Sequence, residues 1–149
     1  MDKKYNIRLT GIPDDVLIRH NNLCTIIDYK TAKYTGTQDQ LFPMYSVQLN
    51  AYSLIAKQLG LFQAKDLAVV YMEPVTDNSM SSNDIVHQRD GFIMNFKSKI
   101  VWVKVDINIV QSLLKKVRDI YDMRSIPNGR GGCKDCQKLI ALFNVAMHK

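Results

Sequence analysis

The chain has 149 residues, of which 46% are hydrophobic and 23% are charged, with a formal net charge of +6. This composition is typical of one globular domain and excludes a disordered or collagenous chain. The longest apolar stretch, residues 139–147, is far shorter than the about 20 residues that a membrane-spanning helix needs. Three cysteines do not suit a disulfide scaffold, and no apolar signal core is visible at the start. We therefore expect a single domain over residues 1–149, in the cytoplasm and without a membrane partner.

The first half of the chain predicts strands and one helix around a polar loop. In order, these are strands at residues 5–10, 16–19 and 23–29, a loop at 31–43, a helix at 44–59 and a strand at 67–72. Turn signals between the second and third strands predict a hairpin. The helical periodicity stops at Gly60, a residue typical of helix ends.

The second half predicts a further hairpin and two helices. Residues 75–90 are rich in Ser, Asn and Asp and predict a mobile loop. Apolar residues alternate on both sides of Ser98, which predicts a hairpin turning near that residue. A well-patterned helix follows, capped by Asp106, and a short helix is expected over residues 137–147. This order of elements predicts an α/β or α+β fold.

Charge is unevenly distributed along the chain. Residues 97–149 carry eleven basic and four acidic side chains. Such a segment is either a surface for a polyanion or the solvated face of amphipathic helices. Among the acidic residues only Glu73 is a glutamate, and we interpret it as a surface residue at a strand end.

Two carboxylates and a lysine are expected to meet at the end of the third predicted strand. Side chains two positions apart on a strand share a face, so Asp28 and Lys30 project together, and Asp14 can approach Asp28 from the neighbouring strand. This set suits metal-assisted hydrolysis of a phosphodiester, since Mg²⁺ binds through one or two carboxylates and a lysine can stabilise developing charge. The Tyr29 side chain is expected to turn into the sheet, which leaves its backbone carbonyl as a further ligand. Taken singly, the Asp28 and Lys30 pair could instead be a surface ion pair, and the sequence around Asp14 could instead be a turn.

A helical pair adds to this set. Gln48 and Tyr52 lie one turn apart on one face of the predicted helix. The order of G-x-x-D at residues 11–14, strand-terminal D-x-K and helical Q-x-x-x-Y resembles the PD-(D/E)XK nuclease superfamily, and most of all its RecB-type branch, which includes CRISPR-associated exonucleases. The resemblance covers residues 7–73 by motif. It implies a restriction-endonuclease-like mixed central sheet flanked by helices.

The resemblance also implies roles for these residues. Asp14 and Asp28 would bind Mg²⁺ or Mn²⁺, Lys30 would be the catalytic lysine, and Gln48 and Tyr52 would orient the site or contact nucleic acid. The implied activity is metal-dependent hydrolysis of DNA in repair, recombination or defence, with a helicase or another recombination or defence subunit as a partner. Two further polar residues follow the strand and either touch phosphate or belong to a solvated loop: Thr31 and Lys33.

One part of the family pattern is missing. Relatives of the RecB type begin with a helix that carries a Glu or His ligand, and no such residue precedes Asp14. We expect either a fragment whose upstream segment supplies it, a partner that supplies it, or a catalytically degraded domain. The alternatives to a nuclease are a non-catalytic nucleic-acid-binding module and a structural module of a helicase–nuclease assembly, with exposed apolar surface and self-association.

The cysteines form a second candidate site. Cys133 and Cys136 follow a glycine-rich turn with the spacing of a metal knuckle, within an expected C-terminal extension over residues 126–149. The remaining Cys24 is expected to be a small buried strand residue. A Zn²⁺ or iron–sulfur site would therefore need ligands from outside this chain, and two unligated thiols are the alternative. A thioredoxin-like role is not expected, because the pair does not open the first helix of a βαβ unit.

Overall fold

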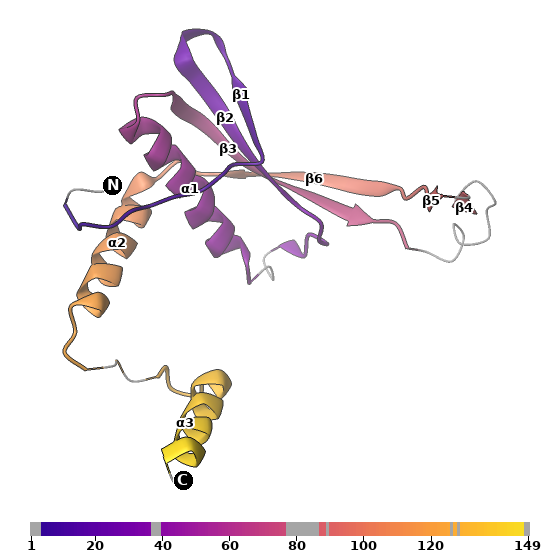
Figure 1. Ribbon diagram of the computed structural model, residues 1–149. Coiled ribbons are helices and arrows are strands. Elements are labelled where there is room, and N and C mark those ends of the chain that lie inside the picture. Colours follow the sequence, from indigo (N-terminus) through magenta and orange to yellow (C-terminus); the bar gives the residue numbers. More distant parts are fainter. Residues whose placement is uncertain are drawn as a thin grey trace.

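The computed structural model describes residues 4–36, 40–76, 87–88, 90–125, 127 and 129–147. Its elements are β1 (Asp15–Ile18), the short helix η1 (His20–Asn22), β2 (Leu23–Lys30), α1 (Phe42–Gln58), β3 (Gln63–Pro74), β4 (His87–Gln88), β5 (Gly91–Phe92), β6 (Phe96–Val103), α2 (Ile107–Tyr121) and α3 (Lys134–Met147). One sheet has the order β1-β2-β3-β6, and β4 and β5 form a separate pair (Figure 1).

The central sheet is mixed. β1 and β2 form the predicted antiparallel hairpin, β2 and β3 run parallel, and β3 and β6 run antiparallel. Parallel neighbours require a crossover connection, and α1 lies in the connection between β2 and β3. In the register, Tyr71 of β3 lies between Lys30 of β2 and Lys99 of β6. This is an α+β fold consistent with the predicted restriction-endonuclease-like architecture.

The face of the sheet that α1 covers, called the front face, holds the main core. Its buried side chains come from β2, α1, β3 and β6: Cys24, Ile26, Leu49, Ala64, Leu67, Val69, Tyr71 and Val103. α2 packs against α1, and a second small cluster forms there from Leu54, Val110 and Leu114. The predicted burial of Cys24 is therefore confirmed.

Apolar side chains on the opposite face of the sheet, the back face, are exposed. Leu17, Tyr29, Ile100 and Trp102 come from three strands, and Trp102 keeps 63% of its surface exposed. Strand alternation and the register place all four on this face. These four side chains give the back face an exposed apolar surface.

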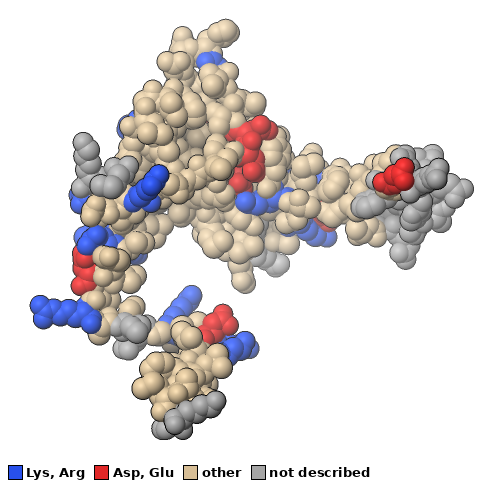
Figure 2. All heavy atoms as spheres, in the orientation of Figure 1, with Lys and Arg blue, Asp and Glu red and all other residues tan. Residues whose placement is uncertain are grey.

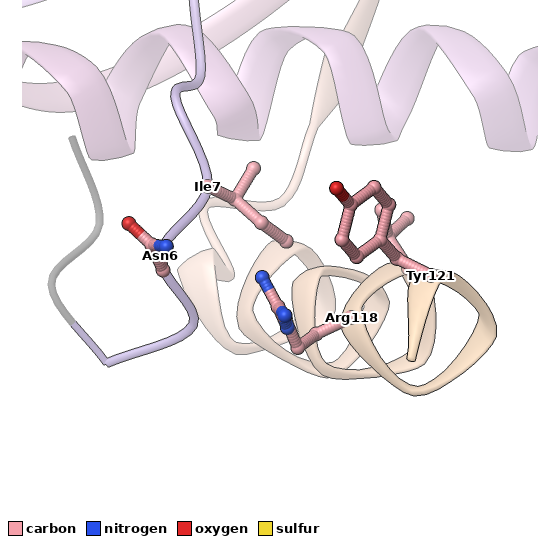
Figure 3. A pocket seen from close by; sticks show the side chains of 5 residues that line it. Asn6, Ile7, Arg118 and Tyr121 are labelled. Carbon is pink, nitrogen blue, oxygen red and sulfur yellow. The ribbon is translucent and has the colours of Figure 1, made fainter. Parts of the chain in front are cut away.

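The first predicted strand, at residues 5–10, is wrong. That segment contains only an isolated bridge at Ile7 and otherwise lacks strand structure. Its alternating apolar side chains pack instead on the cluster between α1 and α2, so the alternation reflects burial against helices and not pairing in a sheet. A hollow lies between this segment and α2 (Figure 3), lined by Asn6, Ile7, Val117, Arg118 and Tyr121.

The predicted hairpin near Ser98 is also wrong. β6 passes straight through Ser98 and pairs with β3 along its whole length, from Phe96 opposite Pro74 to Val103 opposite Leu67. The alternation from Phe96 to Val103 therefore belongs to one strand, whereas Phe92 lies in β5 and Met94 lies between the two strands. Of the predicted mobile loop at residues 75–90, residues 77–86 and 89 lie outside the described residues.

The predicted helices are confirmed with small shifts. Gly60, at the end of α1, has a positive φ of 67°, and the Asp106 carboxylate caps α2 by accepting a hydrogen bond from the backbone N–H of Asn108. α3 starts at Lys134, earlier than predicted. Within the described ranges, no helix has both the length and the apolar character needed to cross a membrane.

Candidate active site

Asp28 and Lys30 lie side by side at the end of β2, on the front face. The Asp28 side chain is buried, with the residue only 2% exposed, and its Oδ2 lies 2.5 Å from Nζ of Lys30. A buried carboxylate is costly unless a charge or hydrogen bond compensates it, and the neighbouring ammonium provides that compensation. The two side chains share a face, as their spacing on the strand predicts.

Gln48 of α1 links both charged groups to Tyr52. Its Nε2 donates hydrogen bonds to Oδ1 of Asp28 at 3.1 Å and to the Tyr52 hydroxyl at 2.8 Å. Its Oε1 accepts a hydrogen bond from Nζ of Lys30 at 3.4 Å. The structure thus brings together four of the five residues for which the resemblance implies roles, and a single amide connects them.

Asp14 lies just before β1, next to this group. The first pair of the β1–β2 ladder is Asp15 with Ile27, so Asp14 stands one step further along, beside Asp28. Its Oδ2 accepts a hydrogen bond at 2.8 Å from the backbone N–H of Tyr29. The Asp14 carboxylate therefore lies against the peptide bond that joins Asp28 to Tyr29.

The expected orientation of Tyr29 is wrong. Its side chain does not turn into the sheet but lies exposed on the back face, where its hydroxyl donates a hydrogen bond to Oδ2 of Asp15 at 2.9 Å. This hydrogen bond raises the pKa of the Tyr29 phenol. Strand alternation puts Tyr29 opposite to its neighbours Asp28 and Lys30, on the face that α1 does not cover. Its backbone N–H and carbonyl point toward the edge where Asp14 lies, because both groups of one strand residue face the same neighbour.

Tyr45 is a contact of Lys30 that was missed from the sequence. Nζ of Lys30 lies 4.7 Å from the centre of the Tyr45 ring, a cation–π distance. Tyr45 also packs edge-on against Tyr71, with 6.3 Å between ring centres. The spacing of Tyr45, Gln48 and Tyr52 along one helix face was the available signal.

Gly11, the first residue of the G-x-x-D motif, was also missed. A Cβ at this position would lie 2.5 Å from Cε1 of the Tyr52 ring. Only glycine allows the chain to pass this close to the ring. Gly11 therefore acts on the site through Tyr52, and the motif glycine was the available signal.

Thr31 and Lys33 lie on the segment that follows β2, outside the hydrogen-bonded group. Both side chains are exposed. Nζ of Lys33 lies 3.5 Å from Oε1 of Glu73, the glutamate near the end of β3. An exposed pair at this distance contributes little stability, so the lysine is available to other partners.

Cys133 and Cys136 lie close together where α3 begins. The backbone N–H of Cys136 donates to Sγ of Cys133 at 3.4 Å, and this bond lowers the pKa of the Cys133 thiol. A Cβ on Gly129 would lie 3.0 Å from Sγ of Cys136, so the preceding loop packs directly on the pair. Within the described part of the chain, no group of three or more His, Cys, Asp or Glu side chains is arranged to hold a metal.

The carboxylates suit a Mg²⁺-type ion that keeps water in its coordination shell better than they suit a metal held entirely by protein ligands. Oδ2 of Asp28 is buried and makes no hydrogen bond within the described residues, and the Lys30 ammonium is the positive charge beside it. Mg²⁺ takes one or two protein carboxylates and completes its shell with water and phosphate oxygens. Asp28 and Asp14 supply donors of that kind and number.

A family model described as the PD-(D/E)XK nuclease superfamily matches residues 1–138. No curated protein and no solved structure matches the chain.

Proposed function

The chain belongs to the PD-(D/E)XK nuclease superfamily, and we propose that it is a divalent-metal-dependent nuclease that hydrolyses DNA phosphodiester bonds. The observation that carries this proposal is the buried pair of Asp28 and Lys30, held by Gln48 and Tyr52 with Asp14 alongside. A hydrophobic core does not need a buried ion pair that is hydrogen-bonded to a helix side chain, and such costly charged groups are typical of functional sites.

The proposed metal ligands are the carboxylates of Asp14 and Asp28 and the backbone carbonyl of Tyr29. Bound Mg²⁺ or Mn²⁺ would polarise the phosphoryl group and lower the pKa of a coordinated water. Two carboxylates leave much of the shell open, so phosphate oxygens, water or a ligand from an upstream segment or a partner would complete it.

The proposed role of Lys30 is to face the reacting phosphate. Its ammonium is held in place by three groups: the Asp28 carboxylate, Oε1 of Gln48 and the Tyr45 ring. From this position it would orient the attacking water or stabilise the negative charge that develops on the phosphate. Gln48 and Tyr52 are proposed as positioning residues that also lie close enough to the site to contact the nucleic acid.

Further assignments extend this proposal. We place the chain in the RecB-type branch, acting in repair, recombination or defence beside a helicase or another subunit of such a system. Thr31 and Lys33 would contact phosphate next to the site. Cys133 and Cys136 would supply two thiolates to a Zn²⁺ or iron–sulfur site whose other ligands come from outside this chain.

A non-catalytic nucleic-acid-binding module is the second candidate. The observation that favours it is the short distance of 2.5 Å between Lys30 and Asp28, since the ammonium already neutralises the buried carboxylate. Degradation of fluorescently labelled DNA with Mg²⁺, with Mn²⁺ and with EDTA separates the two functions. A nuclease degrades DNA only with metal, whereas the module binds DNA and leaves it intact under all three conditions.

A further inference from the structure

Two rows of side chains cross the front face beyond the proposed metal site. In the first row, Tyr71 lies between Lys30 and Lys99 on neighbouring strands. In the second row, Glu73 lies beside Lys97 and close to Lys33. Strands in a sheet are about 4.8 Å apart, so Lys99 is displaced from Lys30 by about 10 Å across the sheet.

The second row stands on a ribbon that extends past the rest of the sheet. The pairing of β2 with β3 ends at Lys30 and Tyr71, whereas β3 and β6 continue to pair as far as Pro74 and Phe96. The backbone N–H of Val75 then donates to the carbonyl of Asn95 at 2.8 Å, which prolongs the ribbon. Figure 1 shows β3 and β6 running out together, well beyond the ends of β1 and β2.

The front of this ribbon is basic. Lys97 and Lys99 of β6 are exposed, as is Lys33, which lies beside the ribbon on the segment after β2, and Figure 2 shows Lys and Arg side chains where the ribbon leaves the sheet. The acidic side chain among them is Glu73, which lies 3.5 Å from Lys33. We call these three lysines the lysine platform.

We propose that the lysine platform binds the phosphate backbone of duplex DNA next to the phosphate that is cut, an inference that rests on the proposed nuclease function. Lys99 is displaced by about 10 Å from Lys30, so it is placed to reach a neighbouring phosphate and not the scissile one, and Lys97 lies two residues further along the same strand. A two-stranded ribbon also fits the major groove of duplex DNA, which is about 12 Å wide.

A single strand is a poorer match for this surface. Proteins that bind single strands stack bases on exposed aromatic rings. Of the ribbon aromatics whose side chains the structure describes, Tyr71 faces the front but is buried, while Phe96 lies on the back. Tyr34, which follows Lys33, is partly buried and packs on Tyr71 with 5.1 Å between the ring centres. Within the described residues, the front of the two ribbon strands therefore offers charges for phosphates and no exposed ring for bases.

The test measures DNA binding by the full chain in EDTA, where cleavage cannot occur. A fluorescein-labelled 20-base-pair duplex and one of its single strands are titrated at several NaCl concentrations, and fluorescence anisotropy gives Kd. The double variant Lys97→Gln, Lys99→Gln is compared with Lys134→Gln, Lys138→Gln on α3, which removes the same charge elsewhere. All four lysines are exposed, so thermal unfolding should be unchanged.

The platform variant should bind the duplex roughly tenfold more weakly, and the slope of log K against log salt should fall by about two, since each phosphate-contacting lysine contributes about one. The single strand should lose less affinity than the duplex, and the α3 variant should behave as the wild type. The proposal would be overturned if the platform variant lost equal affinity for the duplex and the single strand, or if it bound the duplex as tightly as the α3 control variant does. A wild type that binds duplex in EDTA but never cleaves with Mg²⁺ would reject the nuclease and leave the platform intact.

Discussion

Nε2 of Gln48 donates a hydrogen bond to Oδ1 of Asp28, while Oε1 of the same amide accepts one from Nζ of Lys30. The two ends of one side chain therefore face the acid and the base of the buried pair. A glutamate or a leucine in this position would satisfy at most one of them. This relationship ties α1 to the end of β2 and sets the positions of both charged groups.

Replacing Gln48 by leucine should reduce metal-dependent DNA cleavage by roughly tenfold to a hundredfold, the range typical of residues that orient metal ligands. The amide that aligns Asp28 and Lys30 is lost, while both charged groups remain. Single-turnover cleavage rates measure the effect, with Gln111→Leu on the exposed side of α2 as the control. Unchanged cleavage by the Gln48 variant would show that the amide does not position the pair.

Gly11→Ala should displace Tyr52, because the new Cβ would lie 2.5 Å from Cε1 of the ring. We expect a loss of about 1–3 kcal/mol in the free energy of unfolding, the usual cost of forced overpacking, together with slower cleavage. Urea denaturation measures the first effect. Gly91→Ala is the matched control, since its Cβ would meet no atom within 4 Å. Equal stability of the two variants would mean that the ring moves aside without cost.

Asn50 is a fully buried polar residue that fastens α1 to the start of α2. Its Nδ2 donates to the carbonyl of Lys104 at 3.1 Å, and its Oδ1 accepts from the N–H of Asp106 at 2.6 Å. Asn50→Ala leaves both backbone groups without this partner, which should lower the free energy of unfolding by about 2–4 kcal/mol. Ser112→Ala, at an exposed hydroxyl of α2, should cost far less. Denaturation curves that coincide would contradict this account of the helix junction.

The two neighbouring thiols should differ in reactivity. Hydrogen bonding from the Cys136 backbone lowers the pKa of Cys133, whereas the hydrogen bond to Cys133 raises the pKa of Cys136. The Cys133 thiolate therefore persists to lower pH, and iodoacetamide at neutral pH should label Cys133 first, with buried Cys24 last. Mass spectrometry of the metal-free protein over time follows the order. Equal labelling rates of Cys133 and Cys136 would rule out this asymmetry.

Much of the site could be predicted because it depends on local periodicity. The period of a strand places Asp28 and Lys30 together, and the period of a helix places Gln48 and Tyr52 together. Contacts between distant segments were not accessible in this way. The approach of Gly11 to the Tyr52 ring depends on how the segment before β1 crosses α1, which no local pattern encodes.

The errors in the fold have the same origin. Alternation at residues 5–10 indicates one buried side, but it does not reveal whether a strand or a pair of helices buries it. The length of β6 is set by its partner β3, so Ser98 continues the strand where the sequence alone suggests a turn. The exposed position of Tyr29 follows from which face α1 covers, a property of the whole sheet. The expectation of a single domain over residues 1–149 stays a prediction.

The most direct test of the central claim is the rate at which the protein cleaves labelled duplex DNA in Mg²⁺ or Mn²⁺, compared with its Asp28→Asn and Lys30→Met variants. Asp119→Asn and Lys115→Met break an exposed pair on α2 and serve as matched controls. We predict metal-dependent cleavage by the wild type and both controls, and losses of at least about a hundredfold in both site variants, because Asp28→Asn removes the charge of a proposed metal ligand and Lys30→Met removes the cation that faces the reacting phosphate. Cleavage that survives either site substitution, or that proceeds in EDTA, would contradict the account.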